Sequence, residues 1–193
     1  MRAQLSRFWL LLCLLALVGA ASAADDKDKD FAPVSIFANP DFSELDEQGA
    51  PKHWKLTDAI TLEKEGDMKF LRMKVIAPKK DFLVYRRAYL PNPRPEALEI
   101  RAKARWSDIK KGDKPWNDGR IILKFKNNAD KQVGPDPQVR AFSGSSKGWE
   151  DVSYFIPVPK GADYLEVMPF LMQAAAGTLD FAKFDVLTAP KSK

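Results

Sequence analysis

The clearest pattern in this chain is an alternation of apolar and polar residues with a period of two. Between Leu98 and Trp106 every second residue is apolar, and Glu, Arg, Lys and Arg stand between them. In the range 69–76, Leu, Met and Val alternate with Arg and Lys in the same way. Such alternation is typical of a β-strand with one buried and one solvent-facing side. We therefore predict a strand in each of these two ranges.

Further short segments have the composition of strands, and clusters of Pro, Gly, Asn, Asp and Ser separate them. Helical periodicity is scarce, because 172–176 provides at most one turn. Many short strands with such breaks favour an all-β fold, an antiparallel β-sandwich. The additional predicted strands are 34–38, 60–64, 83–90, 120–126, 138–142, 150–158, 164–172 and 178–187.

The two ends of the chain have a different composition. Arg2 and Arg7 precede an apolar run over 8–18, and the small residues before position 24 complete the pattern of a secretory signal peptide cleaved after Ala23. The run is shorter than the roughly 20 residues that span a bilayer. We expect a secreted or periplasmic protein with no membrane span in the mature chain. The predicted parts are the signal peptide 1–23, a flexible charged leader 24–32, a β-sandwich domain 33–189 and a basic tail 190–193.

Loss of the signal peptide would change the chemistry of the chain. The single cysteine, Cys13, would leave with it, so the mature chain could form no internal disulfide and would have no thiol nucleophile. Removal of Arg2 and Arg7 would lower the formal net charge from +5 to +3. This mild excess neither requires nor excludes a polyanionic partner. Nucleic-acid binding is not expected, because the excess is small and no known binding motif is present.

Residues for catalysis are scarce in the sequence. His53 is the single histidine and is predicted to be an exposed turn residue rather than a general base. No G-x-S-x-G motif is present, and the mature chain lacks the cysteine and histidine ligands of a typical zinc site. Paired carboxylates could still hydrolyse a glycosidic bond, but most acidic residues are expected to be surface charges. We therefore expect no enzyme and no cofactor.

Five short motifs follow one another along the chain. They are Asn-Pro-Asp-Phe at 39–42, Gly-Ala-Pro-Lys-His-Trp at 49–54, Gly-Trp at 148–149, Val-Pro-Lys-Gly-Ala-Asp-Tyr-Leu-Glu-Val at 158–167, and Gly-Thr-Leu-Asp-Phe at 177–181. In this order they resemble the galactose-binding-like jelly rolls, especially the carbohydrate-binding modules attached to bacterial glycoside hydrolases, and the resemblance covers 34–188. It implies a jelly-roll sandwich that holds a poly- or oligosaccharide on loops or on a concave sheet face.

Aromatic residues are the natural partners of sugar rings, since a sugar lays its C–H face on a flat aromatic ring. Core packing is the better interpretation for Trp54, Trp106 and Trp149. Trp116 lies in a long polar loop, 107–120, where a large ring either fills a gap beside the sheet or binds a ligand. The resemblance favours a ligand, so the predicted binding residues include Trp116, Asn117, Asp118 and Arg120.

Basic residues suggest an acidic glycan as one possible partner. Arg101, Lys103 and Arg105 alternate along one predicted strand, and Arg120, Lys124 and Lys126 lie on another. If the two strands are neighbours, they form a basic patch that suits a uronic or sulfated polysaccharide, so Lys103 and Arg105 join the predicted binding residues. Otherwise these side chains form a solvated sheet face.

The resemblance also raises the question of a structural calcium ion near the first and last strands. Asp41 and Glu44 carry suitable oxygen ligands in the opening motif. In the closing motif, however, Phe-Ala-Lys at 181–183 stands where the family commonly has Phe-Asp-Asp. We therefore predict no metal site.

The alternative to glycan binding is a structural or protein-interaction module of the bacterial cell envelope, because a sandwich of this kind does not fix the function that it carries.

Overall fold

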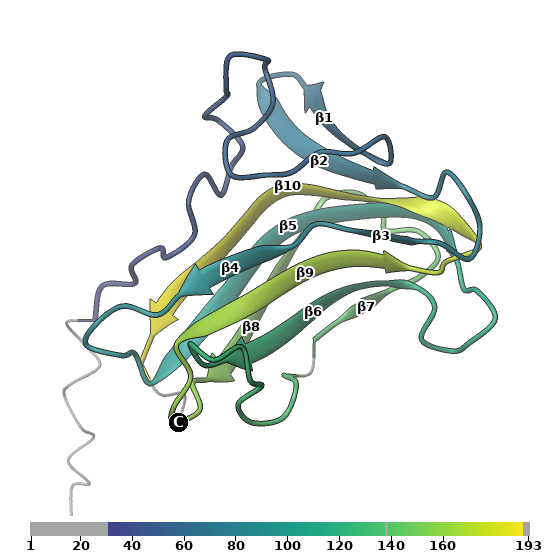
Figure 1. The fold of residues 1–193 in the computed structure, drawn as a ribbon. Helices are drawn as coiled ribbons and strands as arrows, with labels where there is room; N and C mark the ends of the chain where they lie inside the picture. Colours follow the sequence, from purple (N-terminus) through teal and green to yellow (C-terminus); the bar gives the residue numbers. More distant parts are fainter. Residues whose placement is uncertain (1–30, 138, 191–193) are drawn as a thin grey trace, which may run out of the picture. The chain divides into compact units, whose positions relative to one another are not determined.

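Ten strands and no helix are found in the part of the chain that the structure, a computed structural model, describes, namely residues 31–137 and 139–190 (Figure 1). The predicted all-β sandwich is confirmed. The strands are β1 (Ile60–Glu65), β2 (Met68–Lys74), β3 (Asp81–Leu83), β4 (Arg86–Tyr89), β5 (Ala97–Lys110), β6 (Gly119–Lys126), β7 (Ala141–Phe142), β8 (Glu150–Pro157), β9 (Tyr164–Met172) and β10 (Ala176–Ala189).

The strands form two antiparallel sheets. The first, called the β5 sheet here, has the order β1-β2-β10-β5-β8. The second, called the β9 sheet, has the order β3-β9-β6-β7, and β4 also pairs with β9. β3 and β4 pair with successive parts of β9, while β6 pairs with residues 164–171 on its other side. Strands that are neighbours in a sheet are mostly not consecutive in the sequence, as in a jelly roll.

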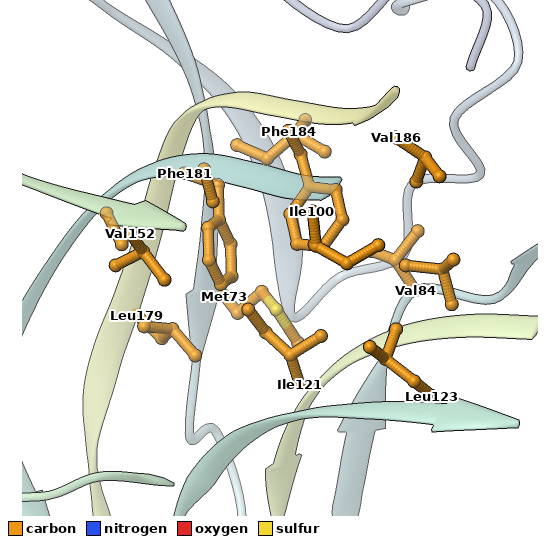
Figure 2. Close-up of a cluster of buried hydrophobic side chains, with 14 of the residues drawn as sticks. Met73, Val84, Ile100, Ile121, Leu123, Val152, Leu179, Phe181, Phe184 and Val186 are labelled. Atoms are coloured by element: carbon orange, nitrogen blue, oxygen red, sulfur yellow. The ribbon is translucent and has the colours of Figure 1, made fainter. Parts of the chain in front are cut away.

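The core lies between the two sheets. In β5 the predicted alternation is confirmed, since Leu98, Ile100 and Trp106 are buried on one side. The charged residues between them lie on the other side, where Glu99 is buried and the remaining three reach the solvent. Figure 2 shows inward side chains from both sheets, among them Ile121 of β6 and Phe181 of β10, in one apolar cluster. Burial of these side chains on both sheets is the main stabilising contribution to a sandwich of this kind.

The opening motif folds around Asn39. This residue has a positive φ of 53°, which asparagine tolerates better than most residues. Its buried amide donates to the carbonyl oxygens of Glu44 and Lys52, each at 2.9 Å, and accepts from the Glu44 backbone N–H at 3.0 Å. Trp54 is buried as predicted, and its indole N–H donates to the carbonyl of Asn39 at 2.8 Å. The exposed His53 lies in the same turn with a φ of 69°.

Three predicted strands differ from those observed. The range 34–38 makes only a bridge, between Ser35 and Leu187. The predicted strand 83–90 is divided into β3 and β4, and Val84 at the break donates its N–H to the carbonyl of Pro169 at 3.1 Å. Pro169 has no N–H to donate in return, so the ladder is interrupted there. The prediction 138–142 is reduced to β7, and Gln138 lies outside the described residues.

The predicted signal peptide, most of the predicted leader and residues 191–193 of the predicted tail also lie outside the described residues. Where the structure does describe the chain, it contains no helix of the length and apolarity needed to cross a bilayer.

Candidate functional site

The structure separates the six predicted binding residues into two groups. Trp116 lies on the loop between β5 and β6, with 53% of its surface exposed. Asn117 and Asp118 follow it and are buried, and Asp118 accepts a hydrogen bond from Nε of Arg120 at 2.8 Å. The other two, Lys103 and Arg105, face outward from β5, in the opposite sheet. Because β5 and β6 belong to different sheets, the two rows of basic side chains do not form one patch.

The outer face of the β5 sheet is dominated by ion pairs. The buried carboxylate of Asp180 accepts hydrogen bonds from both Arg72, at 2.8 and 2.9 Å, and Arg105, at 3.1 and 3.2 Å. The Arg105 guanidinium also lies 4.3 Å from the ring centre of Trp149, which packs against Phe70 at 5.3 Å between ring centres. Trp149 is therefore half-buried on this outer face rather than in the core. These contacts pair the positive and negative side chains of this face with one another.

A second group of aromatic and charged residues lies on the outer face of the β9 sheet, and we call it the tyrosine cluster. Its members come from β4 and the residue before it, from β6 and the turn after it, and from β9. Tyr85 and Tyr89 have 44% and 61% of their surfaces exposed. The cluster consists of Tyr85, Arg87, Tyr89, Lys126, Asp130, Tyr164 and Glu166.

A network of hydrogen bonds fixes the polar groups of the tyrosine cluster. The buried carboxylate of Glu166 accepts from the Tyr85 hydroxyl at 2.6 Å and pairs with the Lys126 ammonium at 3.2 Å. Arg87 donates from Nε to the Tyr85 hydroxyl at 2.8 Å and from Nη2 to Asp130 at 3.1 Å. Charge-assisted bonds of this kind keep donors and acceptors in fixed positions.

The rings of the tyrosine cluster are also held in place. Tyr164 donates its hydroxyl to Asp130, and its ring lies beneath the guanidinium of Arg87 at 4.7 Å. The ring of Tyr89 packs against that of Tyr164 with 5.6 Å between centres. The contact with Tyr164 therefore holds the exposed ring of Tyr89 in place.

The pKa values of the cluster follow from these contacts. The hydrogen bond to Asp130, together with burial, raises the pKa of Tyr164 to about 12. The same hydrogen bond, helped by the charge of Arg87, lowers the pKa of Asp130. Burial and the hydrogen bond to Glu166 raise the pKa of Tyr85. At neutral pH Tyr85 and Tyr164 are thus neutral donors and Asp130 is a charged acceptor.

The same outer face continues along β6 towards the predicted residues. Outward positions of β6 run from Lys126 through Lys124 and Ile122 to Arg120, a distance of about 20 Å at 3.3 Å per residue. Beside Arg120 lies a shallow hollow of about 210 Å³ between β6 and the segment that leads to β7. It is lined by Arg120, Ile122, Asp136, Pro137, Val139 and Ala141, with Ile121 and Leu123 behind them. The face therefore presents both polar and apolar groups along its length.

The tyrosine cluster was not predicted from the sequence, although the alternation within 83–90 contains a signal for it. Tyr85, Arg87 and Tyr89 hold the outward positions of the predicted strand 83–90, alternating with the buried Val84 and Ala88. This period of two could have identified outward tyrosines. It could not show that Asp130 and Glu166, distant in sequence, lie beside them.

The calcium question concerns the opening motif. Asp41 accepts hydrogen bonds from the hydroxyl of Ser43 at 2.7 Å and from its N–H at 3.2 Å. The hydroxyl contributes most to the lowered pKa of Asp41, and Lys183 of the closing motif adds to it. Among residues 31–137 and 139–190, no group of three or more His, Cys, Asp and Glu residues is arranged to hold a metal ion.

Comparison with known proteins identifies the fold. No protein-family model matches the chain, and no curated protein matches it. Among solved structures, the chain is similar to the enzymatically active domain of tailspike protein 4 of bacteriophage CBA120, with a TM-score of 0.55 and 12% identity. That likeness covers 79% of this chain and 21% of the tailspike chain, so this chain spans about a fifth of that structure.

Carbohydrate-binding modules are also similar. A CBM4 structure has a TM-score of 0.50 and 17% identity, covering 80% of this chain and all of that one (100%). The CBM22-1–CBM22-2 tandem domain of Xyn10C from Paenibacillus barcinonensis has a TM-score of 0.50 and 14% identity, covering 86% of this chain and 49% of the tandem. At such identities the likeness establishes the fold alone. This protein has a β-sandwich of the kind found in carbohydrate-binding modules and in parts of enzymes.

Proposed function

We propose that this protein is an exported binding protein for a poly- or oligosaccharide, and that it does not cleave its ligand. The observation that carries the proposal is the pair of exposed tyrosine rings, Tyr85 and Tyr89, beside a fixed network of donors and acceptors on the outer face of the β9 sheet. The glycan lies across this face, with a sugar ring on Tyr89 and hydroxyl groups directed to Arg87 and Asp130, whose side chains reach the solvent.

Physical chemistry supports this arrangement. A tyrosine ring provides an apolar surface for the C–H face of a sugar at a small entropy cost, because it has two side-chain torsions. The sugar hydroxyls lose water when they bind and need partners that are already oriented. The face is about 20 Å long from Lys126 to Arg120, so it offers room for a chain of sugars.

Binding without cleavage is supported by the acid–base properties of the carboxyl groups in the described part of the chain, of which Asp130 belongs to the tyrosine cluster. A glycosidase needs a carboxylic acid that remains protonated near neutral pH, so its pKa must be raised. Within the described residues, each carboxyl group whose pKa departs from its ordinary value has a lowered pKa. These groups are Asp41, Glu65, Glu99 and Asp130.

Affinity electrophoresis over a panel of neutral and acidic polysaccharides tests the proposal. At least one polysaccharide should retard the wild-type protein, and Tyr89→Ala should weaken its binding about tenfold, because one stacking surface is lost. The matched control is Phe155→Ala, which removes a ring that is 55% exposed on the outer face of β8, in the other sheet. The control should bind like the wild type.

Two results would contradict the proposal. One is the absence of retardation by every polysaccharide in the panel, combined with capture of a specific envelope protein, which would favour the interaction-module alternative. The other is an equal loss of affinity in Tyr89→Ala and Phe155→Ala. Trp116→Ala in the same assay shows whether the glycan also reaches the loop predicted from the sequence.

A further inference from the structure

Two loops at one end of the sandwich lie against each other. The loop after β2 and the loop after β5 are joined by an ion pair between Lys79 and Asp113, with 2.9 Å from Nζ to Oδ2. The strands that carry them, β2 and β5, both pair with β10. In Figure 1 both loops lie at the right-hand end, beside the turn from β9 to β10. We call residues 74–81 and 108–116 together the loop tip.

The loop tip carries an excess of positive charge. Its six lysines are all exposed, and its three aspartates leave a formal net charge of +3. One of these aspartates, Asp113, is already paired with Lys79. The lysines are Lys74, Lys79, Lys80, Lys110, Lys111 and Lys114.

Two large apolar side chains project from the same loops. Ile76 is 55% exposed and Trp116 is 53% exposed. Ile76 is three residues from Lys79, and Trp116 is three residues from Asp113, the two partners of the ion pair. Three residues of extended chain span at most about 11 Å. Pro78 is also exposed in the first loop. Apolar side chains surrounded by lysines are a combination that marks an interaction surface.

We infer that the loop tip binds the surface of an anionic lipid bilayer. Trp116 enters the interface between headgroups and acyl chains, where tryptophan is enriched, and Ile76 enters beside it. The lysines extend their apolar stems along the same interface and place their ammonium groups among the lipid phosphates. Each lysine close to an anionic membrane surface strengthens binding about fivefold.

Ile76 distinguishes a membrane from an acidic polysaccharide. A polyanion in water would use the lysines, and a sugar could use the ring of Trp116, but neither gains from an exposed isoleucine. A bilayer removes both apolar side chains from water. The tyrosine cluster stays clear of such a surface. Asp81 of the loop tip pairs with Met172 at one end of β9, whereas Tyr164 lies at the other end, about 26 Å away at 3.3 Å per residue.

Co-sedimentation with lipid vesicles tests the inference on the chain from residue 24 onward, which contains every described strand and the opening turns. At 0.15 M NaCl, it should bind vesicles of equal parts phosphatidylglycerol and phosphatidylcholine at least about tenfold more tightly than pure phosphatidylcholine. The double variant Ile76→Ser/Trp116→Ser, and separately the triple variant Lys110→Gln/Lys111→Gln/Lys114→Gln, should each lose most of this binding. Thermal unfolding should confirm that both variants remain folded.

Matched controls remove similar groups elsewhere on the surface. Phe155→Ser removes an exposed ring on β8, and Lys131→Gln/Lys147→Gln/Lys160→Gln removes three exposed lysines outside the loop tip. Both controls should bind like the wild type. Vesicles should also shift the tryptophan emission of the wild type to shorter wavelength, and Trp116→Ser should abolish the shift.

Three outcomes would overturn the inference. The wild type could bind both kinds of vesicle equally weakly, or a control could lose as much affinity as the matching loop-tip variant. In the third, Ile76→Ser/Trp116→Ser retains full binding while the lysine variant loses it. That result would mean that the loop tip is a polyanion site, and binding of soluble dextran sulfate would then match binding of vesicles.

Discussion

Asn39 is the residue on which the opening turn depends. Its buried amide makes three hydrogen bonds with the backbone of Glu44 and Lys52, and its carbonyl accepts the indole N–H of Trp54. Replacement of its side chain leaves buried backbone groups without partners, each of which costs about 1–3 kcal/mol.

We expect Asn39→Ala to lower the free energy of unfolding by about 3 kcal/mol in urea denaturation, because it also places alanine at a positive φ. Asn39→Gly removes the same amide but accepts that φ, so its loss should be smaller by about 1 kcal/mol. Asn128→Ala, at an exposed position, is the control and should change little. If Asn39→Ala were as mild as Asn128→Ala, the opening turn would not contribute to stability in this way.

Individual residues also show what the sequence can and cannot predict. The burial predicted for Trp54 and Trp106 is confirmed, because a period of two or a strand-entry position indicates the direction of a side chain. Trp149 is half-buried on the outer face of the β5 sheet, where it packs on Phe70 from another strand. Which side chains cover an outward ring depends on strand order, and the local pattern does not contain that information.

Between elements, the close approach of β10 to β5 depends on Gly177. This glycine has a φ of 120° and lies where the register between the two strands shifts. A Cβ atom added there would lie 2.5 Å from Cα and 2.8 Å from the backbone nitrogen of Ile109, so backbone rather than a flexible side chain would have to move.

We expect Gly177→Ala to lower the free energy of unfolding by about 3 kcal/mol or more, measured by urea denaturation. The matched control is Gly66→Ala in the turn between β1 and β2, where φ is also positive at 61° but no atom lies within 4 Å of the added Cβ. It should cost about 1 kcal/mol, from backbone strain alone. Equal losses in the two variants would show that the contact with Ile109 is not the cause.

At the same scale, strand positions were more predictable than strand interruptions. The prediction 164–172 matches β9, because its apolar pattern and its flanking turn residues agree. The predicted strand 83–90 is divided because of Pro169 on its partner, and a break imposed by a partner strand is not visible in the strand's own sequence. For the same reason, the candidate face could be assembled only when β4, β6 and β9 were placed side by side.

For the whole molecule, the paired carboxylates and tyrosines set the pH range of stability. The pKa values of Asp41, Glu65, Glu99 and Asp130 are lowered in the folded state. The unfolded chain therefore binds protons more readily, and the stability that these groups confer is lost as the pH falls below about 4. The pKa values of Tyr85, Tyr154 and Tyr164 are raised. Their contribution is present below the ordinary tyrosine value of 10.0 and is lost as the pH rises towards about 12, the value for Tyr164.

We expect the melting temperature to be nearly constant between pH 5 and 9, approximately, and to fall on both sides of this range. In Asp130→Asn the acid-side decrease should be smaller, and the pKa of Tyr164 should return towards its ordinary value, because the hydrogen bond to Asp130 is the main cause of its shift. Calorimetry follows the melting temperature, and ultraviolet absorbance follows tyrosinate formation. A titration of Asp130→Asn that coincides with that of the wild type would refute this assignment.

The bridge between Ser35 and Leu187 has a mechanical consequence. The N–H of Ile36 donates to the carbonyl of Val186, and the N–H of Thr188 donates to the carbonyl of Val34. The 34–36 segment and the end of β10 are therefore joined by one short antiparallel ladder. Tension applied at both ends of the sandwich domain would break these hydrogen bonds one after another rather than all at once. A force-spectroscopy experiment should therefore show the 34–36 segment peeling away at low force before the two sheets yield.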